Sequence, residues 1–167
     1  SISLKEIDEF KADEFKIVFS KNDDEIQTLL LPDMAICDEC KKELYDKTSK
    51  RYKYPFINCT NCGVRYSIVK NLPYDRGSTS MSDFVMCKDC KKEYEDPKSR
   101  MFHTQPIGCN SCGVKLELIT DIKTTNDDIF ENIASLIKQG CIGAIKGVGG
   151  FHLICDATND DVLKRLR

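Results

Sequence analysis

Two stretches that repeat one another decide the fold. They read CDECKKELYDKTSKRYKYPFINCTNCGV at residues 37–64 and CKDCKKEYEDPKSRMFHTQPIGCNSCGV at residues 87–114. Each stretch carries two Cys-x-x-Cys pairs with 18 residues between them, and the second stretch follows the first by 50 positions. The neighbours that recur at the same offset are Lys41, Lys42, Glu43, Asp46, Ser49, Gly63 and Val64. A repeat with matching flanks indicates a duplicated structural unit.

The four cysteine pairs have the spacing of structural zinc sites. A Cys-x-x-Cys turn can place two sulfurs on one ion, and a second turn completes a tetrahedral shell at about 2.3 Å. We predict two Zn²⁺ ions, each held by four thiolates, with no open coordination position and therefore no catalytic role. The predicted ligands are Cys37, Cys40, Cys59, Cys62, Cys87, Cys90, Cys109 and Cys112. The duplication favours grouping within each copy, although the first pair could instead join the third.

The rest of each copy suggests that the metal carries much of the folding free energy. The repeats hold few large apolar side chains, so a conventional core would be thin. Structural zinc contributes on the order of 10–16 kcal/mol of apparent folding free energy in small modules. We predict that a strong chelator unfolds residues 31–118. Gly63 and Gly113 follow the second pair in each copy, where we expect left-handed backbone that turns N–H groups toward the sulfurs.

Other uses of the cysteines have to be weighed against zinc. Disulfides need an oxidising compartment, but the first residues, SISLKEIDEF, do not form a secretory signal. We therefore expect a cytoplasmic protein, in which four disulfides, or iron in place of zinc, are minor alternatives. No apolar run approaches the roughly 18 residues of a membrane span. Cys141 and Cys155 lack partners at ligand spacing and lie in apolar runs, so we predict that they are buried core thiols.

Charge argues against nucleic acid as the partner of the repeats. Residues 37–112 carry 14 Lys or Arg and 10 Asp or Glu. Eight thiolates with two Zn²⁺ ions would cancel the surplus of four positive charges. A DNA-binding module normally neutralises several phosphates with a basic face. The whole chain, at a net charge of −2, shows no general attraction to nucleic acid or to an anionic membrane either.

The segments on either side of the repeats differ in character. Residues 1–30 hold eight Asp or Glu against four Lys. They include one alternating stretch, Phe15–Phe19, that looks like an edge strand. We interpret this segment as the end of a preceding domain and a linker.

Residues 119–167 have the pattern of an α/β fold. Helix caps are available at Thr124–Asp127, apolar residues recur at helical spacing from Ile129 to Ile137, and Gly140 supplies a stop. We predict buried strands at 142–145 and 151–154, and a second helix that begins at Thr158 with a capping box to Asp161. Because these elements are too few for a complete core, we interpret them as the opening of a truncated domain.

Three smaller features are ambiguous on the residues alone. The segment Lys146-Gly147-Val148-Gly149-Gly150 is more often a tight turn between strands than a phosphate-binding loop. His103 lies inside the second repeat, but four cysteines already fill that shell, so we expect a packing or hydrogen-bonding role. His152 could equally face a substrate cavity or sit as a hydrogen-bonded core residue. For Tyr74-Asp75-Arg76 we favour an internal salt bridge that anchors the linker between repeats over a contact to a neighbouring domain.

A further set of signatures surrounds the cysteines. The run RYKYPFINCTNCG occupies residues 51–63. Other signatures follow in order: Pro73–Arg76 with Thr79 and Met81, Glu93–Pro97, Arg100–His103, Lys146–Leu153 and Cys155–Ala157. Together these residues resemble the HypF family of carbamoyltransferases, over about residues 31–165. One departure is that Val64 and Val114 stand where the family usually has proline, which should alter local rigidity but leave the ligands intact.

The resemblance implies an architecture. It implies a small zinc-stabilised α+β module of two tandem zinc fingers, each with four cysteine ligands, at residues 31–118. Residues 119–167 would begin an α/β YrdC-like domain, and residues 1–30 would end an acylphosphatase-like domain. A carbamoyl-transferring domain of the Kae1 type would come last in the full protein and lie outside this chain.

The resemblance also implies a function. HypF-like proteins convert carbamoyl phosphate and ATP to a carbamoyl adenylate, then pass the carbamoyl group to the C-terminal cysteine of the partner HypE. That group becomes the cyanide ligand of [NiFe]-hydrogenase. Lys146, Gly149 and Gly150 would then belong to the adenylate site, no catalytic residue would lie in this chain, and the chain alone would be inactive. The alternative from another class is an independent zinc-ribbon module that binds protein or nucleic acid.

Overall fold

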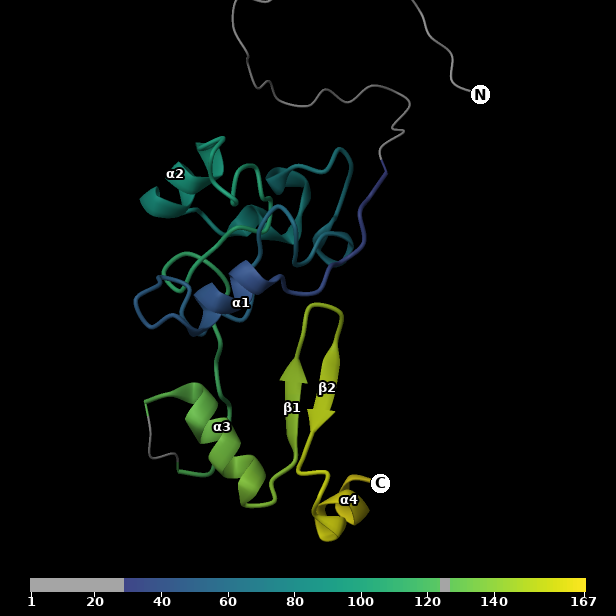
Figure 1. Cartoon of the computed structure of the whole chain (residues 1–167). Coiled ribbons are helices and arrows are strands. Elements are labelled where there is room, and N and C mark those ends of the chain that lie inside the picture. The colour runs from purple at the N-terminus through teal and green to yellow at the C-terminus, as the bar shows by residue number, and fades with distance from the viewer. Residues whose placement is uncertain (1–28, 124–126) are drawn as a thin grey trace, which may run out of the picture.

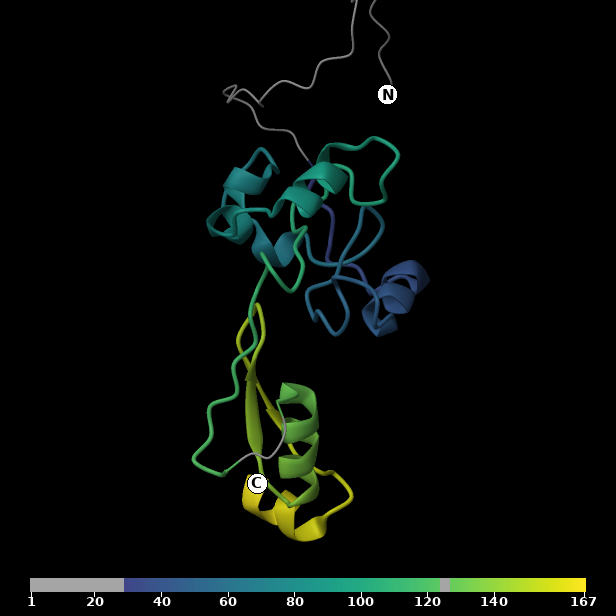
Figure 2. The same ribbon diagram turned by 90° about the vertical axis from the view of Figure 1, so that its left-hand side faces the viewer.

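The computed structural model describes residues 29–123 and 127–167, and its elements form two neighbouring groups (Figures 1 and 2). The two cysteine repeats make the first group, and one helix, a β-hairpin and a final short helix make the second. Residues 114–123, which form no helix or strand, lead from the first group toward the second. The predicted edge strand at Phe15–Phe19 lies outside the described residues.

Each repeat begins with a short helix that starts inside its first cysteine pair. α1 spans Asp38–Tyr45 and α2 spans Lys88–Glu95, with Cys37 and Cys87 as their respective N-caps. Acidic residues in the first turn of each helix interact favourably with the positive end of the helix dipole. The equivalent C-caps, Asp46 and Asp96, each accept a 2.9 Å hydrogen bond from the N–H two residues on, so both copies turn back in the same way.

The two copies pack through reciprocal contacts. The N–H of Thr60 donates to the carbonyl of Arg100 at 3.0 Å. Fifty residues later, the N–H of Asn110 donates to the carbonyl of Lys50 at 3.3 Å. Each copy therefore offers the same two positions to the other, as the subunits of a two-fold dimer do. The duplication seen in the sequence has thus produced an internal, dimer-like interface.

A left-handed residue also repeats between the copies. Lys53 has a φ of 55° and His103 a φ of 48°, which is uncommon for residues other than glycine. Their N–H groups donate to the carbonyls of Leu44 and Tyr94, at 2.8 and 3.0 Å. These bonds close the loop onto the end of the helix in each copy.

The core of the module is small and rich in cysteine, as the composition predicts. Its buried residues are Cys40, Tyr54, Ile57, Cys59, Cys62, Cys90, Met101, Ile107 and Cys109. Tyr54 is fully buried, and its hydroxyl accepts a 3.2 Å hydrogen bond from the N–H of Val114 in the other copy. A methyl group built on Gly113 would lie 2.0 Å from that hydroxyl oxygen.

The two glycines that follow the cysteine pairs therefore serve different purposes. Gly63 has the predicted left-handed backbone, with a φ of 93°. The same prediction is wrong for Gly113, which is not among the positive-φ residues of the described chain. Gly113 is needed because the ring of Tyr54 packs directly against it.

Three short 3₁₀ helices form the segment between the copies: Tyr66–Ile68, Arg76–Ser78 and Ser80–Asp83. Arg76 anchors this segment by donating to the carbonyls of Gln105, Ile107 and Phe84. The internal anchoring predicted for Tyr74-Asp75-Arg76 thus agrees with these contacts, but they join Arg76 to backbone carbonyls and are not the predicted salt bridge.

The second group contains α3 (Ile129–Lys138), β1 (Gly143–Lys146), β2 (Phe151–Ile154) and α4 (Asp160–Leu166). The N–H groups of Gly140 and Cys141 donate to the carbonyls of Ile137 and Leu136, which closes α3 with the predicted glycine stop at a φ of 84°. α3 has ten residues, and no helix in the described ranges could cross a bilayer.

Both predicted helix starts are wrong in detail. Asp128 caps α3 by accepting from the N–H groups of Phe130 and Glu131. Among the predicted caps, Asp127 is not the N-cap because the next residue, Asp128, takes that role. The other predicted caps, at 124–126, lie outside the described residues. Asn159 caps α4, so that helix begins after Asn159 and not at Thr158.

The second strand forms where predicted and the first is shifted by one residue, to Gly143–Lys146 in place of 142–145, but neither is buried. β1 and β2 pair antiparallel, from Gly143 opposite Ile154 to Lys146 opposite Phe151. Phe151 is 70% exposed and Leu153 64% exposed, because a two-stranded sheet with one neighbouring helix cannot cover both faces. Cys141 and Cys155, predicted to be buried, are only half-buried for the same reason.

Candidate metal centres

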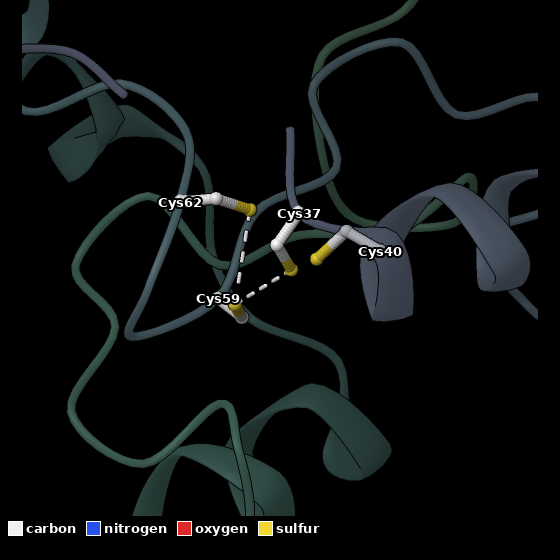
Figure 3. A group of neighbouring side chains, drawn as sticks. All are labelled: Cys37, Cys40, Cys59 and Cys62. Carbon is white, nitrogen blue, oxygen red and sulfur yellow. Dashed lines mark hydrogen bonds between the residues drawn. The ribbon is translucent and has the colours of Figure 1, made fainter. Parts of the chain in front are cut away.

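The structure gathers the eight predicted ligands into two groups of four. Cys37, Cys40, Cys59 and Cys62 form the first group (Figure 3), and Cys87, Cys90, Cys109 and Cys112 form the second. Within each group the sulfur atoms all lie within 4.8 Å of one another. The grouping is therefore tandem, one site in each copy, and not interleaved.

The sulfur separations fit a tetrahedral ion. Four ligands at about 2.3 Å from a central metal lie about 3.8 Å from one another. In the first site Cys59 Sγ lies 3.7 Å from Cys37 Sγ and 3.7 Å from Cys62 Sγ. In the second site Cys109 Sγ lies 3.9 Å from Cys87 Sγ and 3.7 Å from Cys112 Sγ. These distances far exceed a disulfide bond of about 2.05 Å. Both sites are thus compatible with one zinc ion each.

Different local structures present the two pairs of each site. The first pair uses a helix start: Cys37 is the N-cap of α1, and Cys40 lies buried in its first turn. The second pair uses a tight turn, in which the N–H of Asn61 points at Cys59 Sγ from 3.3 Å. The N–H of Ser111 does the same for Cys109 at 3.4 Å. Such donors stabilise a thiolate and orient it toward a cation.

The surroundings of the thiols shift their pKa values in opposite directions. Burial raises the pKa of Cys40 and of Cys90, the enclosed thiols of the two helices. Burial also acts to raise the pKa of Cys109, but the N–H groups of Ser111 and Cys112 outweigh it and lower that pKa to about 7. Because a metal binds the deprotonated form of each cysteine, binding of an ion to these thiols must release protons.

Two arginines that the sequence analysis did not single out as site residues reach these sulfurs. Arg100, from the second copy, donates through Nη1 to Cys40 Sγ of the first site at 2.8 Å. Arg51, from the first copy, donates through Nη2 to Cys90 Sγ of the second site at 3.7 Å. Each metal centre thus receives a positively charged donor from the opposite copy. In the sequence, the signal that could have identified these two residues is an arginine beside the midpoint of each repeat.

Arg51 is held from several sides. Its side chain is only 2% exposed, and it donates to Glu43 Oε1 and to the carbonyl of Gly108, both at 2.9 Å. It also pairs with Glu93 of the other copy. A buried guanidinium is tolerated only with such complete pairing. Glu43 and Glu93 are 50 residues apart and therefore occupy the same position in the two copies, so the interface uses this position twice.

The remaining sequence-predicted residues lie elsewhere. His103 stands outside both sulfur groups, with its ring centroid 4.8 Å from that of Tyr94 and 4.6 Å from that of Phe102. This arrangement fits the expected packing role. Lys146 ends β1 and is exposed, with Nζ 5.4 Å from the centre of the Phe151 ring.

Gly149 and Gly150 lie in the hairpin loop, where the N–H of Gly147 donates to the carbonyl of Gly150 at 2.7 Å. The segment is thus a turn between strands. His152 is exposed on β2, which rules out the interpretation of it as a core residue in this structure.

Comparison with known proteins defines the class of this module. The HypF finger family model matches residues 36–69 and 86–119, one match for each copy. The chain is 54% identical over 167 residues to a probable carbamoyltransferase HypF of Methanocaldococcus jannaschii, covering 98% of this chain and 22% of the relative. It is 52% identical over 160 residues to carbamoyltransferase HypF2 of Cupriavidus necator, covering 93% of this chain and 20% of that relative.

Solved structures agree. A full-length HypF in a phosphate- and nucleotide-bound form aligns with a TM-score of 0.77 at 48% identity, over 83% of this chain and 18% of that one. HypF of T. kodakarensis aligns with a TM-score of 0.73 at 46% identity, over 86% of this chain and 19% of that one. The residues thus define a tandem HypF-finger module. The chain belongs to the HypF family, and it spans about a fifth of the length of the curated relatives that it matches.

Proposed function

We propose that residues 31–118 are a structural zinc module within a carbamoyltransferase. The observation that carries this proposal is 54% identity across nearly the whole chain to a protein named as a probable carbamoyltransferase. The metal would be held by the eight cysteines, four to a site, and it would supply a rigid, closed cross-link between a helix and a turn. Four sulfurs leave no coordination position for a substrate, which supports a scaffold role.

The chemistry of the whole protein would be activation and transfer of a carbamoyl group. By the family resemblance, carbamoyl phosphate and ATP would yield a carbamoyl adenylate, and the C-terminal cysteine of a HypE-like partner would receive the carbamoyl group. This reaction serves [NiFe]-hydrogenase maturation and belongs in the cytoplasm. No catalytic residue of the transfer is assigned to this chain, which we propose to be inactive by itself.

The domain boundaries are part of the same proposal. Residues 119–167 would begin a YrdC-like domain, and residues 1–30 would end an acylphosphatase-like domain. α3 lies beside the hairpin in both views (Figures 1 and 2), as expected for the first layer of an α/β fold. Lys146, Gly149 and Gly150 would contribute to nucleotide binding, because exposed backbone N–H groups and a lysine at one loop suit phosphate oxygens.

The test is carbamoyl-phosphate-dependent exchange between ATP and pyrophosphate, measured on the complete product of the gene that encodes this chain. We expect exchange in the wild type and its loss in Lys146→Ala. A matched control is Gly77→Ala, because a methyl group there would meet no atom within 4 Å. Unchanged exchange in Lys146→Ala would remove that residue from the site. A zinc-loaded wild type without exchange would favour the independent binding module.

A further inference from the structure

A continuous chain of charged groups links the two metal centres. It starts at Cys90 Sγ of the second site, which accepts from Arg51. Arg51 donates through Nη1 to Glu43 Oε1 at 2.9 Å. The other oxygen of the same carboxylate, Oε2, accepts from Arg100, whose Nη1 donates to Cys40 Sγ of the first site at 2.8 Å. One carboxylate therefore stands between two arginines, each of which contacts a ligand of a different site.

The geometry leaves these groups little freedom. Glu43 uses both of its oxygens, one for each guanidinium, and its side chain is 18% exposed. Arg51 is more completely enclosed, so it cannot exchange its protein partners for water. Because a guanidinium is a planar fork, turning it toward one acceptor determines where its other N–H groups point. The position of Arg51 thus constrains Glu43, and Glu43 constrains Arg100.

We propose that the chain Cys90–Arg51–Glu43–Arg100–Cys40 couples the two sites, so that zinc at one raises the zinc affinity of the other. This inference rests on the zinc occupancy proposed above. Four thiolates around one Zn²⁺ carry a net charge of −2, which attracts the arginine that donates to that site. The ordered arginine fixes Glu43, and Glu43 then holds the other arginine against the sulfur of the empty site.

The purpose of such coupling would be to make loading all-or-none. A module with one metal would leave half of the shared core without its cross-link, because the buried cluster draws cysteines from both sites. Arg51, Glu43 and Arg100 act here as positioning residues, since none of them is a ligand. Coupling between two sites in proteins is typically about 5- to 150-fold in affinity.

The test is the distribution of zinc among molecules of the complete chain. Metal-free, reduced protein receives one equivalent of Zn²⁺, and native mass spectrometry counts molecules with no, one or two ions. Independent, equal sites would leave about half of the molecules with a single ion, whereas 100-fold coupling would leave about one tenth. We expect the single-ion species to be clearly below half. A statistical distribution in the wild type would overturn the inference.

The variant Glu43→Gln separates the charged chain from coupling through the shared core. It keeps every ligand and nearly the same volume, but it removes the charge that both arginines share. We expect its single-ion fraction to rise toward one half. The matched control is Glu95→Gln on α2, which removes an exposed carboxylate paired only at 3.8 Å with Lys91 and should keep the wild-type distribution. An unchanged distribution in Glu43→Gln would assign the coupling to the core and contradict the proposal.

Arg100→Lys provides a second route if Glu43→Gln folds poorly. Arg100 is 33% exposed, and lysine at the equivalent position of the first copy, Lys50, already pairs with Glu93. A lysine lacks the fork needed to hold Glu43 and Cys40 together, so we again expect more single-ion molecules. With Co²⁺ in place of zinc, the sulfur-to-metal charge-transfer band should shift because Cys40 loses a donor. An unshifted band with wild-type loading would contradict the proposal.

The outcome also distinguishes this inference from the proposed function. Fewer than two ions at saturating zinc would defeat the proposed zinc occupancy, and the coupling with it. Two ions at saturation with a statistical distribution at half saturation would defeat the coupling alone.

Discussion

Gly113→Ala is a sharp test of how the two fingers fit together. A methyl group at this position would lie 2.0 Å from the hydroxyl oxygen of Tyr54, 2.6 Å from Cζ and 3.0 Å from Cε2. Tyr54 is fully buried between the copies, so its ring cannot swing into solvent. The substitution must therefore displace either the ring or the turn that carries Cys112.

The size of the effect follows from the number of contacts that are too short. Overpacking a tight core by one methyl group typically costs 1–3 kcal/mol, and three simultaneous clashes with a fixed ring place this case at about 3 kcal/mol. For a module of this size that corresponds to a fall in Tm of roughly 12–24 °C. Part of the clash involves the hydroxyl, so Tyr54→Phe should reduce the cost of Gly113→Ala in a double-mutant cycle.

The assay is thermal unfolding of the zinc-loaded chain, with free zinc held constant by a metal buffer because ligand concentration affects Tm. Gly77→Ala is the control, since its methyl group meets open space and should change the free energy of unfolding by less than about 0.5 kcal/mol. If Gly113→Ala behaves like Gly77→Ala, the packing of Tyr54 against Gly113 is not as described. If Gly113→Ala lowers the free energy of unfolding equally in the wild-type and Tyr54→Phe backgrounds, the hydroxyl of Tyr54 does not contribute to the clash.

Three further predictions concern the metal, an anchoring carboxylate and a histidine. A strong chelator should unfold residues 31–118, seen as loss of chemical-shift dispersion; dispersion that survives removal of the metal would contradict this. Asp33→Ala should cost about 1 kcal/mol, because Asp33 accepts from the N–H of Arg65 at 2.7 Å and from Ser67. Burial acts to raise the pKa of Asp33, but these hydrogen bonds outweigh it and leave the pKa below its ordinary value. The cost of Asp33→Ala is measured by denaturant unfolding of both proteins at each pH. It should have its full value above the unfolded-state pKa of about 3.9 and vanish as the pH falls through the lower pKa of the folded state. A cost independent of pH would show that the charge is not involved. His103→Asn should still bind two zinc ions by metal analysis, since asparagine tolerates the left-handed backbone; loss of one ion would make His103 a ligand.

The fingers could be predicted from sequence because their determinants are local. Cysteine spacing places two sulfurs on one turn, and the 50-residue repeat favours tandem over interleaved grouping. The arginines that donate to the sulfurs could not be assigned in this way. Arg51 and Cys90 are 39 positions apart, and only the packing of one copy on the other brings them together. Gly113 illustrates the same point, since its neighbour Tyr54 belongs to the opposite copy.

Outside the fingers, element types were easier to predict than their limits or burial. Helical spacing from Ile129 and a glycine stop at Gly140 were sufficient to locate α3. The choice of Asp128 as its cap depends on tertiary structure as well, because the same carboxylate pairs with Lys53 of the first finger. The burial prediction for the strands was wrong because an apolar pattern indicates which face a strand would cover, and not whether a neighbour is present to cover it.

The central claim is that two closed, four-sulfur sites hold the metal, and zinc K-edge absorption spectroscopy tests it most directly. The fully loaded chain should contain two zinc ions, and the spectrum should show a single shell of four sulfur atoms at about 2.3 Å around each. A nitrogen or oxygen shell at about 2.0–2.1 Å would contradict the claim, because it would mean that another group replaces a cysteine and that the sites are not closed.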